Sequence, residues 1–155
     1  MDSARSSAGW ELTEHTADVG IHAWGPSAAS VFEQAALAML SLITDVSAVE
    51  PAGERAVEAE APARDLLLAA FLNEVLYLIE AGRFVPAAVR VKELAQLRTE
   101  GGETGESWHV RARISGESFD RARHRVRTVV KAATLHGLSL TERDGAWEAA
   151  VVLDV

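Results

Sequence analysis

The sequence predicts a single α+β domain in which about three helices pack on one mainly antiparallel sheet. Three observations lead to this prediction. The chain has 155 residues, of which 48% are hydrophobic, and this suits one domain with one core. Several segments alternate with the two-residue period of strands and follow one another as hairpins. Other segments carry apolar residues at helical spacing.

The ends and the composition narrow the class of protein. Residues 1–9 have no apolar stretch typical of a secretory signal, so we expect a disordered tail before a domain that spans residues 10–155. No run of about 18 apolar residues occurs, which predicts no membrane span. Cysteine is absent, which excludes disulfides and thiolate metal sites. The expected compartment is the cytoplasm.

The first half of the chain predicts strands and two helices. Residues 10–24 alternate loosely and predict one or two strands around the segment EHTADVG. Ser27 is the expected N-cap of a helix that continues to Ile43. Residues 55–61 predict a strand. Pro62 is expected to open the next helix, which is apolar nearly all round, lies deep in the core and ends at Gly82.

The second half predicts two hairpins with a helix between them. Residues 87–100 and 107–117 predict strands joined by a glycine-rich turn. Ser118 is the expected cap of a third helix, whose buried side would run from Phe119 to Ala133. Residues 134–155 predict a final hairpin that turns at Asp144-Gly145, the dipeptide with the strongest short-range hairpin preference.

The last strand ends on a charge that needs a partner. Residues 147–155 alternate and are mostly apolar, which predicts a half-buried or fully buried strand. Asp154 is costly there unless it is paired, and the terminal carboxylate of Val155 adds a second negative charge. Two negative groups at the end of a packed strand therefore indicate a cation.

The segment HTADVG, residues 15–20, allows two interpretations. In the first, Asp18 or Thr16 caps backbone amides in a turn. In the second, Asp18 converges with Asp154 and the Val155 carboxylate. Three negative charges in one place would repel each other strongly, and a divalent cation would relieve that repulsion. Oxygen donors alone favour hard ions, and calcium tolerates irregular oxygen cages better than magnesium.

Other chemical signals are weak. The sequence has no glycine-rich phosphate loop, no nucleophile elbow and no zinc spacing among its five histidines. Lys131 is explained by the favourable interaction of a cation with the C-terminus of a helix. His136, next to Gly137, is typical of a turn histidine.

Basic residues are concentrated in one part of the chain. From Arg111 to Lys131 there are seven basic and two acidic side chains, a local charge of +5 that leaves −13 for the rest of a chain whose net charge is −8. Such a stripe can face RNA or an acidic partner, or can be a solvated helix face with salt bridges to the body. The net negative charge disfavours a general nucleic-acid binder.

Four segments, in order, resemble the archease family. They are EHTADVGIHAWGPSAASVFEQAALAML, LLLAAFLNEVLYLIEAGRF, VRTVVKAATLHGLSL and WEAAVVLDV, and the resemblance extends from about Glu11 to Val155. It implies an accessory protein, not an enzyme, that activates the GTP- and manganese-dependent RNA ligase of tRNA splicing and RNA repair. It implies promotion of ligase guanylylation and of multiple turnover, with RNA contacted through the ligase.

The resemblance also implies a metal site at Asp18, Asp154 and Val155, for which calcium is preferred and magnesium or manganese is possible. It connects Lys131 with activity, and His15 and His136 are further functional candidates. Two other classes stay open: a small metal-dependent hydrolase, in which the ion would activate water, and a chaperone-like binding module without metal chemistry.

Overall fold

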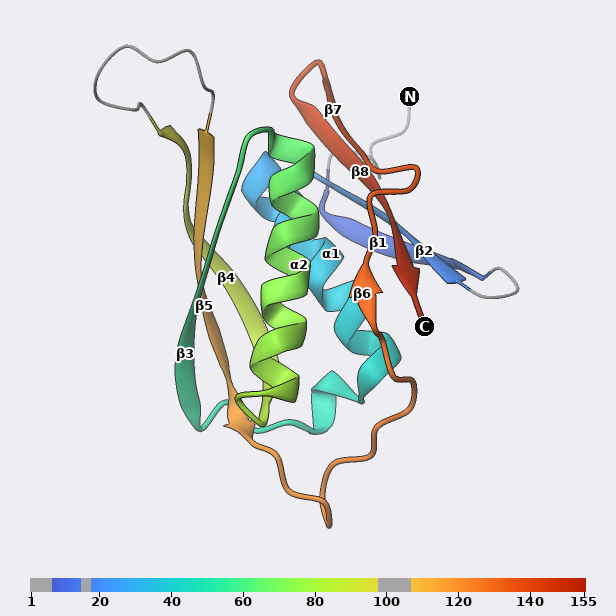
Figure 1. Ribbon diagram of the computed structural model, residues 1–155, viewed down its shortest axis with the longest axis vertical. Coiled ribbons are helices and arrows are strands. Elements are labelled where there is room, and N and C mark those ends of the chain that lie inside the picture. The colour runs from blue at the N-terminus through green and yellow to red at the C-terminus, as the bar shows by residue number, and fades with distance from the viewer. Residues whose placement is uncertain (1–6, 15–17, 98–106) are drawn as a thin grey trace.

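The computed structural model of the protein describes residues 7–14, 18–97 and 107–155. Two helices, α1 (Ala28–Ile43) and α2 (Arg64–Glu80), lie between two sheets (Figure 1). The α+β class is therefore confirmed. The expectation of one sheet is wrong, because the strands of the described residues divide into two sheets.

The first sheet is built from both ends of the chain. It contains β1 (Gly9–Glu14), β2 (Asp18–Gly25), β8 (Ala146–Asp154) and β6 (Ala132–Ala133) in that order, with β7 (Ser139–Arg143) also paired to β8. All of its pairings are antiparallel. The predicted turn between β7 and β8 is confirmed, since Asp144 and Gly145 both have positive φ, 54° and 79°.

The second sheet contains β3 (Gly53–Ala61), β5 (Ser107–Ser118) and β4 (Phe84–Leu97), again antiparallel. Its inner face covers the helices with alternate residues of β5, namely Val110, Ala112 and Ile114, all fully buried. Its outer face carries the charged residues between them. This alternation is the one that the sequence predicted for residues 107–117.

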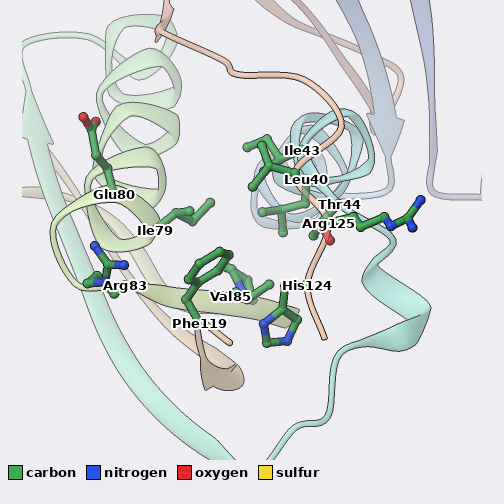
Figure 2. A pocket seen from close by; sticks show the side chains of 12 residues that line it. Leu40, Ile43, Thr44, Ile79, Glu80, Arg83, Val85, Phe119, His124 and Arg125 are labelled. Atoms are coloured by element: carbon green, nitrogen blue, oxygen red, sulfur yellow. The ribbon is translucent and has the colours of Figure 1, made fainter. Parts of the chain in front are cut away.

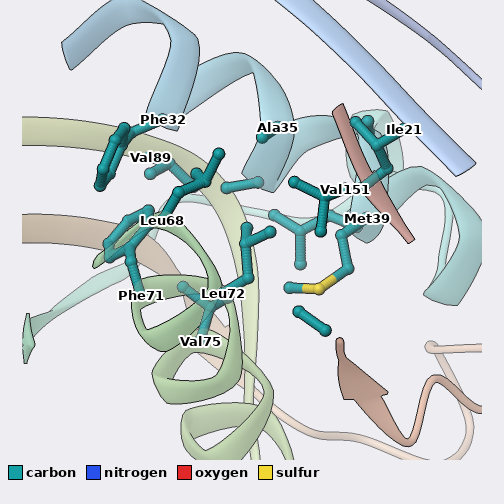
Figure 3. Close-up of a cluster of buried hydrophobic side chains, with 14 of the residues drawn as sticks. Ile21, Phe32, Ala35, Met39, Leu68, Phe71, Leu72, Val75, Val89 and Val151 are labelled. Carbon is teal, nitrogen blue, oxygen red and sulfur yellow. The ribbon is translucent and has the colours of Figure 1, made fainter. Parts of the chain in front are cut away.

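The helices supply most of the core. Their facing sides bring Phe32 of α1 and Phe71 of α2 into ring contact, with centroids 5.7 Å apart, and Ile21 and Val151 of the first sheet close the cluster (Figure 3). One edge of α2 remains open to solvent, where Tyr77 is 66% exposed. The helix is thus less deeply buried than its composition predicted.

The helix ends agree in part with the expectations. Ser27 caps α1 in a reciprocal pair with Ser30, as predicted for its N-cap position. The helix α2 begins at Arg64, two residues after Pro62, without a side-chain cap. It ends at Glu80, and the left-handed residue that follows is Arg83, with φ of 50°, and not Gly82.

The predicted third helix is absent from the structure. After Ser118 the chain makes one turn, in which the amides of Arg123 and His124 bond to the carbonyl of Asp120, and it then runs without regular structure to β6. Instead of continuing a helix, the Arg127 amide bonds to the carbonyl of Ile43 at 2.7 Å. The run of β-branched residues at 128–130 has low helix propensity, so these tertiary hydrogen bonds prevail.

A short 3₁₀ helix (Val46–Ala48) links α1 to β3.

At the N-terminus of α2, the guanidinium of Arg64 lies between the rings of Trp108 and Trp147, at 4.9 and 5.0 Å from their centroids. These two rings belong to different sheets, so Arg64 ties the sheets together. Within the described residues, no helix is long and apolar enough to cross a membrane.

Candidate functional site

Asp18 and Asp154 lie directly opposite each other in the β2–β8 pair. Asp18 is the first residue of β2 and Asp154 is the last residue of β8. Opposed residues of antiparallel strands have Cβ atoms about 4.5–5.5 Å apart and point to the same face. The convergence that the sequence analysis considered for these two carboxylates is therefore found in the fold.

The face that carries them is the outer one. The adjacent pair, Val19 and Leu153, is buried at 7% and 0% exposure against the helices. Since successive side chains of a strand alternate, Asp18 and Asp154 point away from the helices. The terminal carboxylate of Val155 follows Asp154 directly in the chain, so a third negative group is attached to the same strand end.

The carboxylate of Asp18 has an unsatisfied atom. Its Oδ1 is buried and has no hydrogen-bond donor among the described residues. A buried acceptor without a partner is costly, and like charges directly opposite one another add to that cost. A cation relieves both, so the two side chains with the chain terminus fit a hard divalent ion held by oxygens.

Side chains alone do not complete such a site. In the parts of the chain that the structure describes, no three His, Cys, Asp or Glu side chains are arranged so that they could hold a metal ion. The third donor must therefore come from elsewhere, and the Val155 carboxylate is adjacent. His15, the other candidate in this region, lies outside the described residues.

Lys131 is held beside Asp154 through the backbone. Its amide donates to the carbonyl of Asp154 at 2.8 Å, and the amide and hydroxyl of Thr134 both donate to the carbonyl of Val152 at 2.9 Å. These bonds fix β6 along the end of β8. The Lys131 side chain is exposed and starts from the residue next to the one that pairs with Asp154.

The other edge of β6 is held by a residue that the sequence analysis missed. The Asn73 side chain donates from Nδ2 to the Ala133 carbonyl at 3.1 Å and accepts at Oδ1 from the Ala133 amide at 2.8 Å. Its amide thus acts like a strand neighbour. No local signal identifies this role, because the two residues are distant in sequence.

His136 is not brought to the carboxylate pair. It lies exposed in the turn before Gly137, whose φ is 66°. No hydrogen bond or ion pair within the described residues joins it to Asp18 or Asp154. The structure therefore supports the turn interpretation for its local setting, and its functional role stays a prediction.

The basic stripe is divided between separate surfaces. Arg111 and Arg113 lie on the outer face of the second sheet, and Arg123 lies near the chain reversal after β5. Each contacts a carboxylate of the body: the distances are 3.6 Å to Glu93, 3.1 Å to Glu54 and 2.6 Å to Glu117, respectively. For these three residues the expected salt bridges to the body are confirmed, but the expected helix face is wrong, because Arg111 and Arg113 lie on β5 and Arg123 lies in an irregular segment.

The same outer face of the first sheet carries a second titratable cluster. His22 of β2 contacts Glu11 of β1 at 2.9 Å through Nδ1 and Glu148 of β8 at 3.0 Å through Nε2. Burial lowers the pKa of His22, but the hydrogen bonds and charges of the two glutamates together outweigh it, so its pKa is raised. The cluster links three strands and was not anticipated, because its members are far apart in sequence.

Comparison with known proteins gives matches to one family. Residues 10–155 match the family described as the archease protein family (MTH1598/TM1083). The protein archease of Methanopyrus kandleri is 38% identical over 148 residues, covering 94% of this chain and 99% of that protein. The protein archease of Methanosarcina mazei is 38% identical over 146 residues, covering 94% and 95%.

Solved structures agree with the fold. The solution structure of Methanobacterium thermoautotrophicum protein 1598 superposes with a TM-score of 0.76 at 33% identity, covering 95% of this chain and 99% of that one. A Thermotoga maritima structure, titled an archease and possible chaperone, has a TM-score of 0.53 at 19% identity. It covers 94% of this chain and 96% of that one, and it shows the similarity of the fold alone.

Proposed function

The chain belongs to the archease family, and on this premise we propose that it activates the GTP-dependent RNA ligase of tRNA splicing and RNA repair. In this proposal the protein promotes guanylylation and multiple turnover of the ligase and does not itself join RNA. RNA is contacted through the ligase, in the cytoplasm. The observation that carries the proposal is the opposed pair of Asp18 and Asp154, with an unpartnered buried oxygen on Asp18.

Asp18, Asp154 and the Val155 carboxylate would hold a divalent ion, for which calcium is preferred because the donors are oxygens in an irregular arrangement. When bound, the ion supplies charge neutralisation. Three carboxylates against a charge of +2 leave the site without strong positive potential. The contribution of the three residues is therefore positional: they join the end of β8 to the start of β2 as one rigid surface.

Lys131 supplies the positive charge of this surface. Its backbone is fixed to Asp154, while its exposed side chain is free to reach a phosphate as a point charge. The surface is proposed to dock beside the nucleotide site of the ligase. Lys131 would then orient the nucleotide phosphates or the ligase loop that contacts them, which favours formation of the ligase–GMP adduct.

Ligase–GMP formation tests this proposal. The assay uses the cognate ligase in its manganese buffer with a limiting amount of this protein. Wild type should accelerate adduct formation, and Lys131→Ala should lower the acceleration while leaving the melting temperature unchanged. Arg113→Glu, on the outer face of the other sheet, is the matched surface control. Absence of stimulation by wild type would refute the proposal.

A second measurement tests the metal site separately. Added calcium should raise the melting temperature of wild type by mass action. Asp154→Asn and Asp18→Ala should remove most of this rise. Extension of the chain beyond Val155 should weaken it too, because the terminal carboxylate becomes an amide. Equal calcium responses in wild type and variants would refute the ligand assignment.

One observation favours a second candidate, a chaperone-like binding module. Val129 and Leu135 are large apolar side chains that are 68% and 62% exposed, and exposed apolar surface can hold unfolded clients. Suppression of client aggregation that survives a chelator and the Asp18→Ala change would support this candidate. Loss of suppression in either condition would count against it.

A further inference from the structure

The segment from Arg121 to Leu135, here called the 121–135 arm, exposes apolar side chains. Five large hydrophobic side chains are exposed in the described part of the chain, and three of them belong to this arm: Val126, Val129 and Leu135, at 54%, 68% and 62%. Exposed apolar side chains are the groups through which soluble proteins bind partners. The arm therefore has the apolar character of a binding surface.

The arm also carries positive charges that, within the described parts of the chain, are not paired with carboxylates, with the exception of Arg123, which contacts Glu117. No carboxylate of the described residues lies within 4.0 Å of the charged groups of Arg121, Arg125 or Lys131, in contrast to the three arginines that pair with glutamates. The chain as a whole has a net charge of −8. A local positive surface on an acidic protein selects a partner segment of negative charge.

An apolar cavity of about 170 Å³ opens beside the arm. Figure 2 shows four side chains around it: Leu40 and Ile43 of α1, Ile79 of α2, and Phe119, which lies between β5 and the arm. Exposed Arg83 and Arg125 lie on opposite sides of this lining (Figure 2). A cavity of about 150 Å³ accepts benzene in another protein, so this one has room for the side chain of leucine, methionine or phenylalanine.

The wall of the cavity next to the arm is fixed by hydrogen bonds. His124 is only 7% exposed, and its Nδ1 accepts from the Asp120 amide at 2.8 Å, so Nε2 carries the proton. Glu117 Oε1 is 2.9 Å from Nε2. That contact is out of line for a hydrogen bond, and Nε2 has no other partner. The hydrogen bond to Nδ1 holds this part of the cavity wall in place, and a wall that is already ordered lowers the entropic cost of binding.

We propose that the 121–135 arm and this cavity bind an acidic segment of a partner protein, which inserts one bulky apolar side chain between Arg83 and Arg125. The carboxylates of the segment would pair with the unpaired cations of the arm. The chemistry of the site does not depend on the proposed function. Only the identification of the partner as the RNA ligase rests on it.

The same observations disfavour RNA as the occupant. Single-stranded RNA is bound by stacking of bases on exposed aromatic rings, and the exposed apolar residues of the arm are aliphatic. The ring of Phe119 is covered by the Arg83 guanidinium, 5.8 Å from its centroid.

Peptide titration followed by two-dimensional ¹H–¹⁵N NMR tests the proposal. The probes are a short peptide of Asp and Glu with a central leucine, the same peptide with a central alanine, and a single-stranded RNA oligonucleotide. The leucine peptide should shift the amides around the cavity, and replacing leucine by alanine should weaken binding about tenfold or more, since a buried leucine contributes that much. RNA should cause smaller shifts.

Surface variants complete the test. Val126→Asp and Arg125→Glu, both at exposed positions, should each weaken binding of the leucine peptide about tenfold. Arg111→Glu should leave the affinity for this peptide unchanged. The proposal is overturned if RNA alone binds, if the alanine peptide binds equally well, if neither probe binds, or if Arg111→Glu acts like Arg125→Glu. An intact cavity site together with no binding to the ligase would refute the proposed function and leave this inference standing.

Discussion

Replacing Asn73 by leucine should detach β6 from α2 and destabilise the fold by about 2–4 kcal/mol. The side chain makes two hydrogen bonds to the backbone of Ala133, at 2.8 and 3.1 Å. At a net value of about 1 kcal/mol each, their loss costs about 2 kcal/mol. Ala133 is 5% exposed, so water replaces the lost partners incompletely, and the unsatisfied amide and carbonyl raise the cost toward about 4 kcal/mol.

Asn73→Asp separates the two hydrogen bonds. The carboxylate keeps an acceptor for the Ala133 amide, but its other oxygen faces the Ala133 carbonyl. This repulsion disfavours the charged form in the folded state, so the pKa of the introduced carboxyl is raised there. The charged carboxylate therefore destabilises the fold fully above that raised pKa. This destabilisation decreases as the pH falls below the raised pKa and is gone below the pKa that the carboxyl has in the unfolded chain. The difference in the free energy of unfolding between Asn73→Asp and wild type should therefore decrease at acidic pH.

Urea unfolding followed by tryptophan fluorescence measures both effects, with the midpoint lowered at unchanged slope. Glu74→Gln, the exposed next residue of α2, is the matched control and should stay within about 0.5 kcal/mol of wild type. Hydrogen exchange of the Ala133 amide should accelerate in the leucine variant. A stability change below about 0.5 kcal/mol for Asn73→Leu would refute the reasoning.

Three further predictions concern the rest of the fold. The raised pKa of His22 means that its charged form stabilises the fold fully below about pH 6.5, and that this stabilisation is lost as the pH rises through the raised pKa. The urea midpoint of His22→Gln should lack this pH dependence. An NMR titration in which the pKa of His22 is not raised would contradict the prediction. Arg64→Ala should lower the free energy of unfolding by about 1 kcal/mol, because two cation–π contacts are lost; an unchanged urea midpoint would show that the clamp is not stabilising. Gly116→Ala should cost about 2 kcal/mol or more by overpacking, since a Cβ would lie 2.0 Å from the backbone oxygen of Val85; a wild-type melting temperature would exclude this.

Much of the local structure was predictable because its causes are local. The Ser27 cap, the Asp144-Gly145 turn and the alternation of residues 107–117 each depend on a few adjacent residues, and each was found. The prediction of a third helix was wrong because it used local spacing alone, whereas hydrogen bonds to distant residues decide this segment. Its apolar spacing was locally acceptable, but Arg127 and Lys131 donate their amides to Ile43 and Asp154 instead.

The site was only partly predictable. The costly charge of Asp154 at the end of an apolar strand indicated that a partner was needed. The segment HTADVG offered Asp18 as one of two interpretations, and resemblance to a family favoured it. The anchoring role of Asn73, the cluster around His22 and the cavity beside Val126 left no signal in the sequence. Each of these joins residues from segments that are distant along the chain.

The sequence by itself determined the class of the fold, most of its strands and helices and the chemical problem at its C-terminus, because alternation, capping and turn residues act over short range. The tertiary structure alone decided which strands are neighbours, and thereby that Asp18 faces Asp154 across β2 and β8. It also decided that Arg111, Arg113 and Arg123 of the basic segment contact carboxylates of the body, whereas Arg121, Arg125 and Lys131 contact none among the described residues. The physical reason is that strand order and the docking of β6 are fixed by the burial of one shared core, to which residues from the whole chain contribute.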